Sequence, residues 1–280
     1  MEHELFTVTF WGVRGSTPCP LNQVLQYGGN TACIHLQMGR RQLILDGGTG
    51  IRQLGELLSQ KDEPIKADIF VSHPHWDHIQ GFPFFTPFYS EQNYFNIYGE
   101  RKGILSFESI IKGIMKYPYF PIEWNHMKAN FTFEEITSDI SLDLGDEILV
   151  RTVELNHPGG SLGFRIEYSG KSCCYLSDME HKEHDSIIEN FVRNSDVLIY
   201  DAQYTNDEYY GYQHGEGRKG WGHSTWSKGV QLASRTQIHK LILFHHDINR
   251  TDDDIKILEQ EAGKMFPNVL AAYEGLKLVL

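Results

Sequence analysis

Hydrophobic and polar positions follow two different periods along the chain, which predicts strands interleaved with helices. In the first third, short β-branched and aromatic runs are separated by glycine-rich turns, as is typical of strands. These runs are Phe6–Trp11, Ala32–Leu36, Gln42–Asp46 and Ala67–Val71. Between the last two, four apolar residues recur at helical spacing, namely Ile51, Leu54, Leu57 and Leu58. A strand–helix–strand order favours a layered α/β architecture.

The second half of the chain repeats this alternation. Its predicted strands are Leu149–Leu155, Gly163–Tyr168, Ser172–Leu176, Val197–Tyr200 and Lys240–His245, and its predicted helices lie near Asp185–Arg193, Ser224–Ser234 and Asp252–Met265. We expect Thr251 to cap the last helix, with Asp252–Asp254 adding favourable negative charge at its amino end. Sheets with helices packed outside them are the economical arrangement of such elements.

The segment between the two halves, residues 82–135, is rich in aromatics and proline and contains one helical stretch near Ile104–Lys116. Such a segment is typical of a pocket wall or of a surface subdomain whose aromatic side chains pack on one another, and the second interpretation is the simpler. We see no repeat, low-complexity stretch or linker between domains. We therefore predict one domain over residues 1–280, with residues 82–135 as an aromatic-rich insertion.

Composition narrows the class of protein. The 280 residues are 40% hydrophobic and 22% charged, which excludes a globally disordered chain. The net charge of −12 repels the phosphate backbone of nucleic acid, so we expect no large nucleic-acid partner. The sequence leaves the oligomeric state open, with a homodimer among the options.

Localisation signals point to the cytoplasm. The start Met1–Glu4 lacks a basic region followed by an apolar one, so we do not expect secretion. No apolar run approaches the roughly 18 residues that a membrane helix needs. The four cysteines are too few for a disulfide framework at this length, and the adjacent pair Cys173–Cys174 matches no metal-binding spacing.

The strongest chemical signal directly follows the predicted strand Ala67–Val71, and it reads Ser72-His73-Pro74-His75-Trp76-Asp77-His78. His73 and His75 are two residues apart in extended chain, so both imidazoles can converge on one cation. Asp77 and His78 then face a neighbouring position. Imidazole with carboxylate suits zinc, and equally manganese or iron. Because this pattern arises by chance in roughly one chain in five hundred of this composition, a histidine-rich surface loop is the weaker interpretation.

Three isolated residues extend this set at the ends of other predicted strands. His157 follows Leu149–Leu155, Asp178 follows Ser172–Leu176, and His245 ends the strand that starts at Lys240. Taken singly, each is typical of a capping or surface residue. Together with the loop they make seven candidate ligands, and an aspartate between two cations can bridge them.

The order of these motifs resembles the metallo-β-lactamase fold superfamily, over nearly the whole chain from about Phe6 to His245. The segment Leu45-Asp46-Gly47-Gly48-Thr49-Gly50 adds to the resemblance. The resemblance implies an αββα sandwich. It also implies that one metal takes His73, His75 and His157, that the other takes Asp77, His78 and His245, and that Asp178 bridges them.

Two further segments, Ile199-Tyr200-Asp201-Ala202 and Gly222-His223-Ser224-Thr225, resemble the ribonuclease Z and phosphodiesterase branch. In that branch an acidic residue at the strand end orients the histidine. Here the acid is Asp201, where ribonuclease Z more commonly has glutamate. The resemblance makes His223 a proton donor to the leaving oxygen. The competing interpretation is that His223 lies beside a Ser224 helix cap and that Asp201 is a solvated strand end.

These residues suit hydrolysis of a phosphodiester. Two cations shield the phosphate and activate water near neutral pH, His223 held by Asp201 protonates the leaving alkoxide, and Asp77 accepts a hydrogen bond or proton from the nucleophile. No basic arm for RNA docking is visible, because Arg40–Arg41 and Arg101–Lys102 are isolated pairs. We therefore predict a metal-dependent hydrolase, with two divalent ions, most simply zinc, acting on a small diester such as a cyclic nucleotide.

Other functions stay open at this point. The same metals can hydrolyse a lactone or thioester, whose leaving groups need less protonation, or RNA as a processing endonuclease. A non-hydrolytic metal or redox module is a third class, although His75 stands where a flavodiiron-type site requires an acid. The segment Tyr204–Trp221 carries several tyrosines and glycines, which is typical of a lid that stacks a base or of a polar loop.

Overall fold

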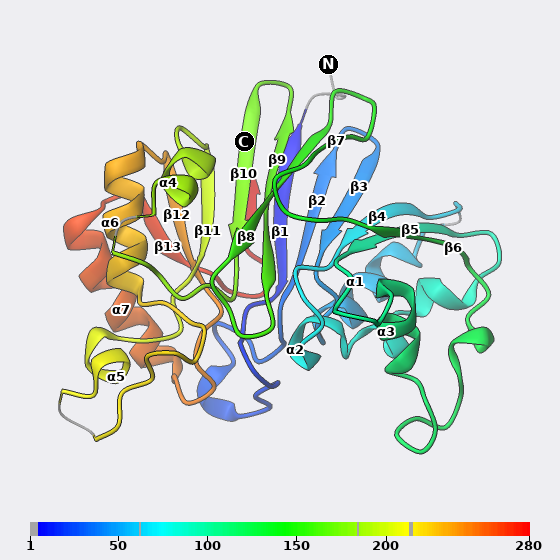
Figure 1. The fold of residues 1–280 in the computed structure, drawn as a ribbon, viewed down its shortest axis with the longest axis horizontal. Coiled ribbons are helices and arrows are strands. Elements are labelled where there is room, and N and C mark those ends of the chain that lie inside the picture. Colours follow the sequence, from blue (N-terminus) through cyan, green and yellow to red (C-terminus); the bar gives the residue numbers. More distant parts are fainter. Residues whose placement is uncertain (1–4, 62, 184, 213–214) are drawn as a thin grey trace. The chain divides into compact units, whose positions relative to one another are not determined.

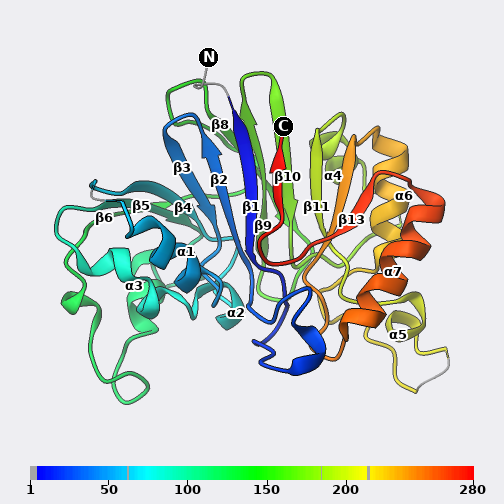
Figure 2. The ribbon, with the colours of Figure 1, turned by 180° about the vertical axis from the view of Figure 1, so that it is seen from behind.

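The computed structural model describes residues 5–61, 63–183, 185–212 and 215–280. The chain divides into two compact units. Unit 1 comprises the described residues of Met1–Pro18, Asn30–Thr137 and Glu274–Val279, and unit 2 those of Cys19–Gly29, Ser138–Tyr273 and Leu280. Across the described residues each unit holds one seven-stranded mixed sheet (Figures 1 and 2). The predicted α/β class is confirmed.

The sheet of unit 1 has the order β14-β1-β2-β3-β4-β5-β6. The strands β14, β1, β2 and β3 pair antiparallel, whereas β3, β4, β5 and β6 pair parallel. The strand bounds are β1 Phe6–Gly12, β2 Cys33–Met38, β3 Arg41–Leu45, β4 Lys66–Phe70, β5 Tyr94–Gly99, β6 Asn130–Glu135 and β14 Lys277–Val279. The helices of this unit are α1 Ile51–Leu58, α2 Trp76–Ile79 and α3 Phe107–Gly113, with short 3-10 helices η2 Phe82–Phe84, η3 Thr86–Tyr89 and η4 Trp124–His126.

The core of unit 1 joins α1 to the aromatic segment. Helix α1 buries Ile51, Leu54 and Leu58 and leaves Leu57 exposed, as an amphipathic helix should. Six aromatic side chains of the segment lie in the same hydrophobic cluster, namely Phe82, Phe85, Phe88, Phe95, Phe107 and Trp124. Burying each such side chain contributes about 1.5–3 kcal/mol to folding.

These aromatics also contact one another, because the rings of Phe88 and Phe95 lie 4.8 Å apart and those of Phe88 and Phe131 5.0 Å. Mutual packing is what the simpler interpretation of residues 82–135 predicted. The segment also supplies β5 and β6 to the sheet, which sequence reasoning missed. The description of residues 1–280 as one domain with an insertion stays a prediction.

The sheet of unit 2 has the order β13-β12-β11-β10-β9-β8-β7. Here β10, β11, β12 and β13 pair parallel, whereas β7, β8, β9 and β10 pair antiparallel. The strand bounds are β7 Ser141–Asp143, β8 Leu149–Leu155, β9 Ser161–Tyr168, β10 Lys171–Leu176, β11 Val197–Asp201, β12 Lys240–Phe244 and β13 Val269–Ala271. The helices are α4 Ser186–Val192, α5 Asn206–Tyr210, α6 Trp226–Thr236 and α7 Asp252–Met265, with the 3-10 helix η1 Asn22–Val24.

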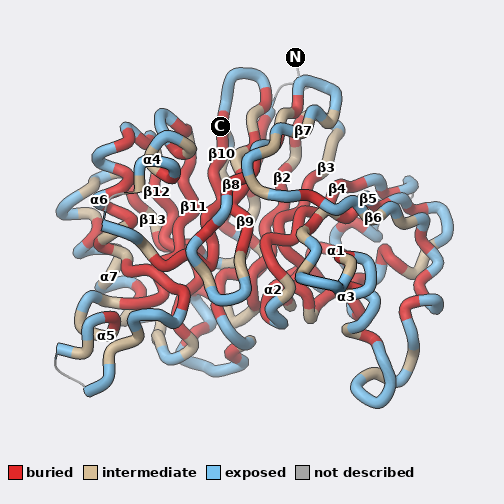
Figure 3. Tube along the Cα trace, viewed as in Figure 1, coloured by how far each residue is buried: buried red, intermediate tan, exposed pale blue. Residues whose placement is uncertain are grey.

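Helix α6 packs on β11 and β12 between α4 and α7, and α7 packs on β13. Figure 3 shows β11 and β12 as buried strands, which agrees with their near-continuous apolar sequences. Among the described residues no helix has both the length and the apolar character needed to cross a bilayer.

The structure tests two helix caps suggested by the sequence, Thr251 for α7 and Ser224 for α6. Thr251 caps α7 with a capping box formed with Asp254, which confirms the predicted cap. Helix α6 starts at Trp226, and the Thr225 side chain accepts from the Lys228 amide, so the Ser224 cap in the competing interpretation of His223 is wrong. The reason is that the Ser224 hydroxyl is engaged elsewhere, with the Tyr200 hydroxyl at 2.8 Å.

In both units, polar residues follow the carboxyl ends of parallel strands. In unit 1, Asp46 follows β3 and Ser72 lies just beyond β4. In unit 2, Asp178 lies just beyond β10, Asp201 ends β11 and His245 follows β12. The carboxyl edge of a parallel sheet is where ligands bind in α/β proteins, so each unit carries candidate site residues at this edge.

Candidate metal centre

The loop after β4 gathers the four candidate ligands of unit 1. His75 is the extended residue that precedes α2, and Asp77 and His78 lie in the first turns of that helix. The rings of His73 and His75 are 4.3 Å apart and those of His73 and His78 4.4 Å. His73, Asp77 and His78 are buried, whereas His75 is exposed. The structure thus brings together the imidazoles that the sequence pattern singled out.

Asp46 orients this loop, and sequence reasoning did not assign it a role in the site. Its carboxylate is fully buried and accepts from His78 Nδ1 at 2.7 Å, from the Ser72 amide at 2.7 Å and from the Ser72 hydroxyl at 2.9 Å. Because Nδ1 of His78 is engaged, its Nε2 is the nitrogen that would bind metal, and Nε2 lies 3.3 Å from Asp77 Oδ2. The Ser72 hydroxyl also lies 3.1 Å from His73 Nδ1.

The glycines after Asp46 explain how the chain passes so close to this loop. A Cβ on Gly48 would lie 2.3 Å from the Asp77 carbonyl oxygen, and one on Gly47 would lie 2.0 Å from the Phe82 ring. Asp46 itself adopts a left-handed φ of +60°. A non-glycine residue in that region is uncommon and points to a functional constraint. The sequence signal that could have assigned Asp46 to the site is an aspartate at the end of a predicted strand, directly before two glycines.

Asp178 is the centre of the unit 2 half-site. Its Oδ1 lies 3.0 Å from His245 Nε2, and its Oδ2 lies 3.6 Å from His157 Nε2. The opposite ring nitrogens are held by acceptors, with His157 Nδ1 donating to the Gly222 carbonyl at 2.8 Å and His245 Nδ1 to Gln203 Oε1 at 2.9 Å. Each histidine therefore presents Nε2 to one oxygen of the same carboxylate.

This donor set fits divalent metal ions. Imidazole Nε2 atoms and a shared carboxylate, with the far ring nitrogens fixed by carbonyl oxygens, are the arrangement that metal-binding histidines show. Asp178 and His245 adopt left-handed φ values of +54° and +59°. Each such residue costs of order 1–3 kcal/mol and persists where function requires its geometry. Gln203 is a positioning residue that sequence reasoning missed, because its contact spans 42 positions.

Asp201 and His223 form the predicted pair. His223 Nδ1 lies 2.8 Å from Asp201 Oδ2, so the shorter aspartate reaches the ring. Asp201 is fully buried and also accepts from the Met179 and Gln203 amides at 3.2 and 3.1 Å. The competing interpretation of Asp201 as a solvated strand end is therefore wrong. The His223 ring packs between His157 and His245, at 5.3 and 5.0 Å.

Burial around the Asp201–His223 pair shifts the pKa values of two other side chains. Burial raises the pKa of the Tyr204 phenol, whose ring lies 5.8 Å from that of His223. Burial also lowers the pKa of His181, aided by Lys228. Four residues of unit 2, Asp178, Asp201, His223 and His245, offer potential ligand atoms that all lie within 4.8 Å of one another. This geometry leaves His223 open to two roles, proton donor or ligand.

The comparisons with known proteins agree with this chemistry. A family model described as "Beta-lactamase superfamily domain" matches residues 41–246. The chain belongs to the metallo-β-lactamase superfamily. It is similar to a ribonuclease Z of Oceanobacillus iheyensis, with 28% identity over 73% of this chain and 78% of the relative.

Two solved structures share the fold. The metallo-β-lactamase fold protein YhfI from Bacillus subtilis superposes with a TM-score of 0.74 and 20% identity, covering 99% of this chain and 100% of that one. A diphosphatase from the PhnP family superposes with a TM-score of 0.69 and 18% identity, covering 98% and 97%. The predicted sandwich fold of the superfamily is confirmed, and the ribonuclease Z relatives agree with the predicted resemblance to the ribonuclease Z and phosphodiesterase branch.

The chain is thus a metal-dependent hydrolase, as predicted, and the histidine–aspartate clusters of both units suit divalent ions. The assignment of individual ligands stays a prediction.

Proposed function

We propose that this protein is a dinuclear-metal phosphodiesterase acting on a small diester, such as a cyclic nucleotide. The observation that carries the proposal is the buried Asp201–His223 pair, joined at 2.8 Å beside the rings of His157 and His245. An alkoxide departs poorly without a proton, whereas the thiolate of a thioester departs more readily. A histidine that is hydrogen-bonded to a carboxylate can donate this proton to the leaving alkoxide.

The proposed ligands of the two ions follow the superfamily resemblance. His73, His75 and His157 would hold one ion, Asp77, His78 and His245 the other, and Asp178 both. Divalent ions there supply positive charge that offsets the phosphate and lower the pKa of bound water. Zinc is the simplest candidate for these ligands, and manganese and iron are the alternatives.

The chain's own residues carry the proton transfers. Asp201 accepts from Nδ1 and stabilises the charged imidazolium of His223, so that Nε2–H can protonate the leaving oxygen. Asp77 is held by the Ser16 amide, which donates to its Oδ2 at 2.7 Å. Its carboxylate would accept a hydrogen bond from the attacking nucleophile in addition to binding metal.

The substrate class rests on charge. A chain with a net charge of −12 and isolated basic pairs has little to attract a polyanion, which favours a small diester. RNA is the second candidate, because the similar protein of O. iheyensis is named ribonuclease Z. A small phosphate substrate agrees with the diphosphatase among the structural neighbours.

One metal-replete preparation assayed on four substrates tests the proposal. We expect turnover of bis(p-nitrophenyl) phosphate and of cyclic AMP to exceed that of a lactone and of a transfer RNA precursor. Good lactone turnover without diester turnover would overturn the phosphodiesterase assignment, and preferred cleavage of the transfer RNA precursor would replace the small diester with RNA.

A further inference from the structure

We propose that Glu180 is a positioning residue that orients His157 and His223 together, through the backbone of Gly220–Gly222. The inference rests on the proposed function for the roles of the two histidines. Its structural content is a hydrogen-bonded path that runs from one buried carboxylate to a histidine ring nitrogen.

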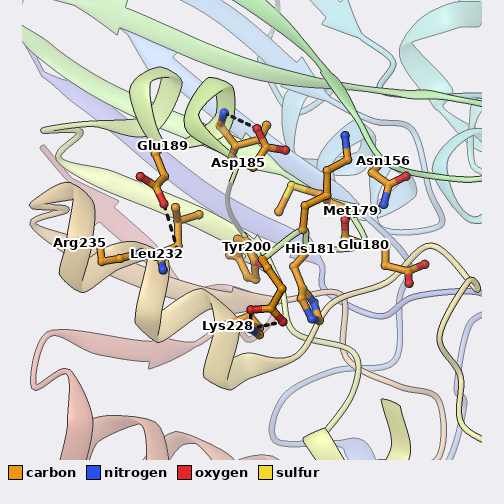
Figure 4. Close-up of a pocket in the computed structure, with 13 residues that line it drawn as sticks. Asn156, Met179, Glu180, His181, Asp185, Glu189, Tyr200, Lys228, Leu232 and Arg235 are labelled. Carbon is orange, nitrogen blue, oxygen red and sulfur yellow. Dashed lines mark hydrogen bonds and ion pairs between the residues drawn. The ribbon is translucent and has the colours of Figure 1, made fainter. Parts of the chain in front are cut away.

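Glu180 is held firmly beside the site. Its backbone amide donates to the Asn156 carbonyl at 2.8 Å, and the Asn156 side chain donates back to the Glu180 carbonyl at 3.0 Å. Figure 4 shows these two residues beside each other at a pocket of unit 2, with His181 and Lys228 among the other lining residues. Asn156 immediately precedes His157 in the sequence.

Glu180 is only 9% exposed, and among the described residues the hydrogen bonds to its carboxylate come from Tyr209, Gly220 and Gly222. Oε1 accepts from the Tyr209 hydroxyl at 2.7 Å and from the Gly220 amide at 2.8 Å. Oε2 accepts from the Gly220 and Gly222 amides at 3.0 and 3.1 Å. Burying a carboxylate costs free energy unless it is hydrogen-bonded. The Glu180 carboxylate and the backbone amides of Gly220 and Gly222 therefore determine each other's position.

Gly222 transmits that position to His157. Its carbonyl accepts from His157 Nδ1 at 2.8 Å. Its φ is +89°, and a Cβ there would lie 2.4 Å from Nδ1 itself, so only glycine brings the backbone this close. With the proton held on Nδ1, His157 offers Nε2 toward Asp178.

The same backbone leads directly into His223. Gly220 also has a left-handed φ, of +90°. The turn that is hydrogen-bonded to Glu180 ends at Gly222, one residue before His223, the proposed proton donor. Glu180 therefore links a proposed metal ligand with a proposed general acid without contacting either. The Gly220 and Gly222 amides donate to the Glu180 carboxylate, so removing this carboxylate should change the orientation of the two histidine rings while leaving both histidines in the site.

The experiment compares three variants in the full chain. Glu180→Ala removes the acceptors. Glu180→Gln keeps them, because its carbonyl can accept from Gly220 and Gly222 while its amide donates to a reoriented Tyr209 hydroxyl. Tyr209→Phe is the matched control, since it removes one donor and leaves both glycine bonds.

Two readouts are needed. The first is the His157 tautomer in metal-free protein, from ring ¹⁵N–¹H correlations. The second is zinc affinity together with kcat and KM for cyclic AMP and bis(p-nitrophenyl) phosphate. For Glu180→Ala we expect a mixed His157 tautomer and zinc affinity reduced about 10–100-fold, as for loss of other outer-shell partners. Glu180→Gln and Tyr209→Phe should keep the Nδ1–H tautomer and stay within about threefold of wild-type affinity.

The outcomes separate the inference from the proposed function. If the wild-type protein binds zinc and cleaves diesters but Glu180→Ala changes neither tautomer nor affinity, the positioning role is wrong and the function stands. If the wild-type protein cleaves no diester, the function fails while the tautomer readout still tests the path. Should Glu180→Ala not fold, Glu180→Asp replaces it, because its shorter side chain loses reach, and wild-type behaviour of that variant would overturn the inference.

Discussion

Each unit contains a carboxylate–histidine pair beside its candidate ligands, but the two sets of ligands are spaced differently along the chain. In unit 1, the four candidate ligands lie within six consecutive positions, and the buried Asp46 holds His78 Nδ1 at 2.7 Å. In unit 2, the candidate ligands lie at three strand ends between residues 157 and 245, and the buried Asp201 holds His223 Nδ1 at 2.8 Å. The unit 1 ligands come from one local loop, whereas the unit 2 ligands are brought together by the pairing of the strands from β8 to β12.

The comparison shows that a carboxylate–histidine pair does not by itself indicate a role. His78 lies beside another candidate ligand, Asp77, whereas His223 lies beside residues that already form a ligand set around Asp178. In our proposal the same contact therefore supports metal binding in unit 1 and proton donation in unit 2. The following predictions are ordered by their effect on turnover.

Asp178→Ala should have the largest effect. Its two oxygens face His245 and His157, so its loss removes the proposed bridge. We expect turnover to fall by more than about 1,000-fold and bound metal to fall from about two ions per chain to one or fewer. Elemental analysis of reconstituted protein measures this directly, and an unchanged stoichiometry of two would exclude the bridging role.

His223→Ala should retain both metals and lower turnover of cyclic AMP by roughly 100- to 10,000-fold, the contribution of a positioned proton donor. Because p-nitrophenolate leaves without protonation, the loss on bis(p-nitrophenyl) phosphate should be much smaller. Steady-state kinetics on both substrates give the ratio. Equal losses would contradict proton donation, and loss of metal would make His223 a ligand.

The pair Asp46→Asn and Asp201→Asn tests the comparison between the units. Asp46→Asn should weaken metal binding about 10–100-fold, because the amide has one oxygen where the Ser72 amide and His78 Nδ1 now use one carboxylate oxygen each. Asp201→Asn should leave metal binding unchanged and reproduce part of the His223→Ala defect, since an amide stabilises the imidazolium poorly. Metal titration and kinetics on each variant decide this, and identical defects would mean that the two pairs share one role.

A substitution of His35, in β2, should have the smallest effect on turnover. His35 should also make the stability of the fold depend on pH. Burial lowers the pKa of His35 to about 4 from 6.5, so the unfolded chain binds more protons between these values. The free energy of unfolding should therefore fall as the pH drops through this window, by about 2 kcal/mol at pH 5.

His35→Gln should remove this His35 contribution while leaving turnover at pH 7.5 unchanged. Urea unfolding of metal-free wild-type and His35→Gln protein at pH 8 and pH 5 measures the difference. The same loss of stability in both proteins would show that His35 does not take part.

Several elements of this protein, and one cluster of candidate ligands, can be predicted from residues that are close together in the sequence. Helix α7 spans Asp252–Met265 as predicted, because its apolar period, its Thr251 cap and its acidic first turn all act within a few residues. The loop from His73 to His78 is visible for the same reason, since its ligands are neighbours in the chain. The missed strands β5 and β6 show the limit, because aromatic-rich segments such as Tyr94–Gly99 pack equally well in a loop.

Tertiary structure decided the contacts that orient the ligands. Asp46, Gln203 and Glu180 reach these partners across 26 or more positions, which is beyond the reach of any local spacing pattern. Ser224 looked like a helix cap, yet it bonds Tyr200 on a neighbouring strand. Propensity and periodicity act over one or two turns of chain, whereas a buried carboxylate takes whichever donors the strand order brings to it. The sequence alone therefore determines the elements and the ligand types, and the folded sheets determine which nitrogen each histidine presents.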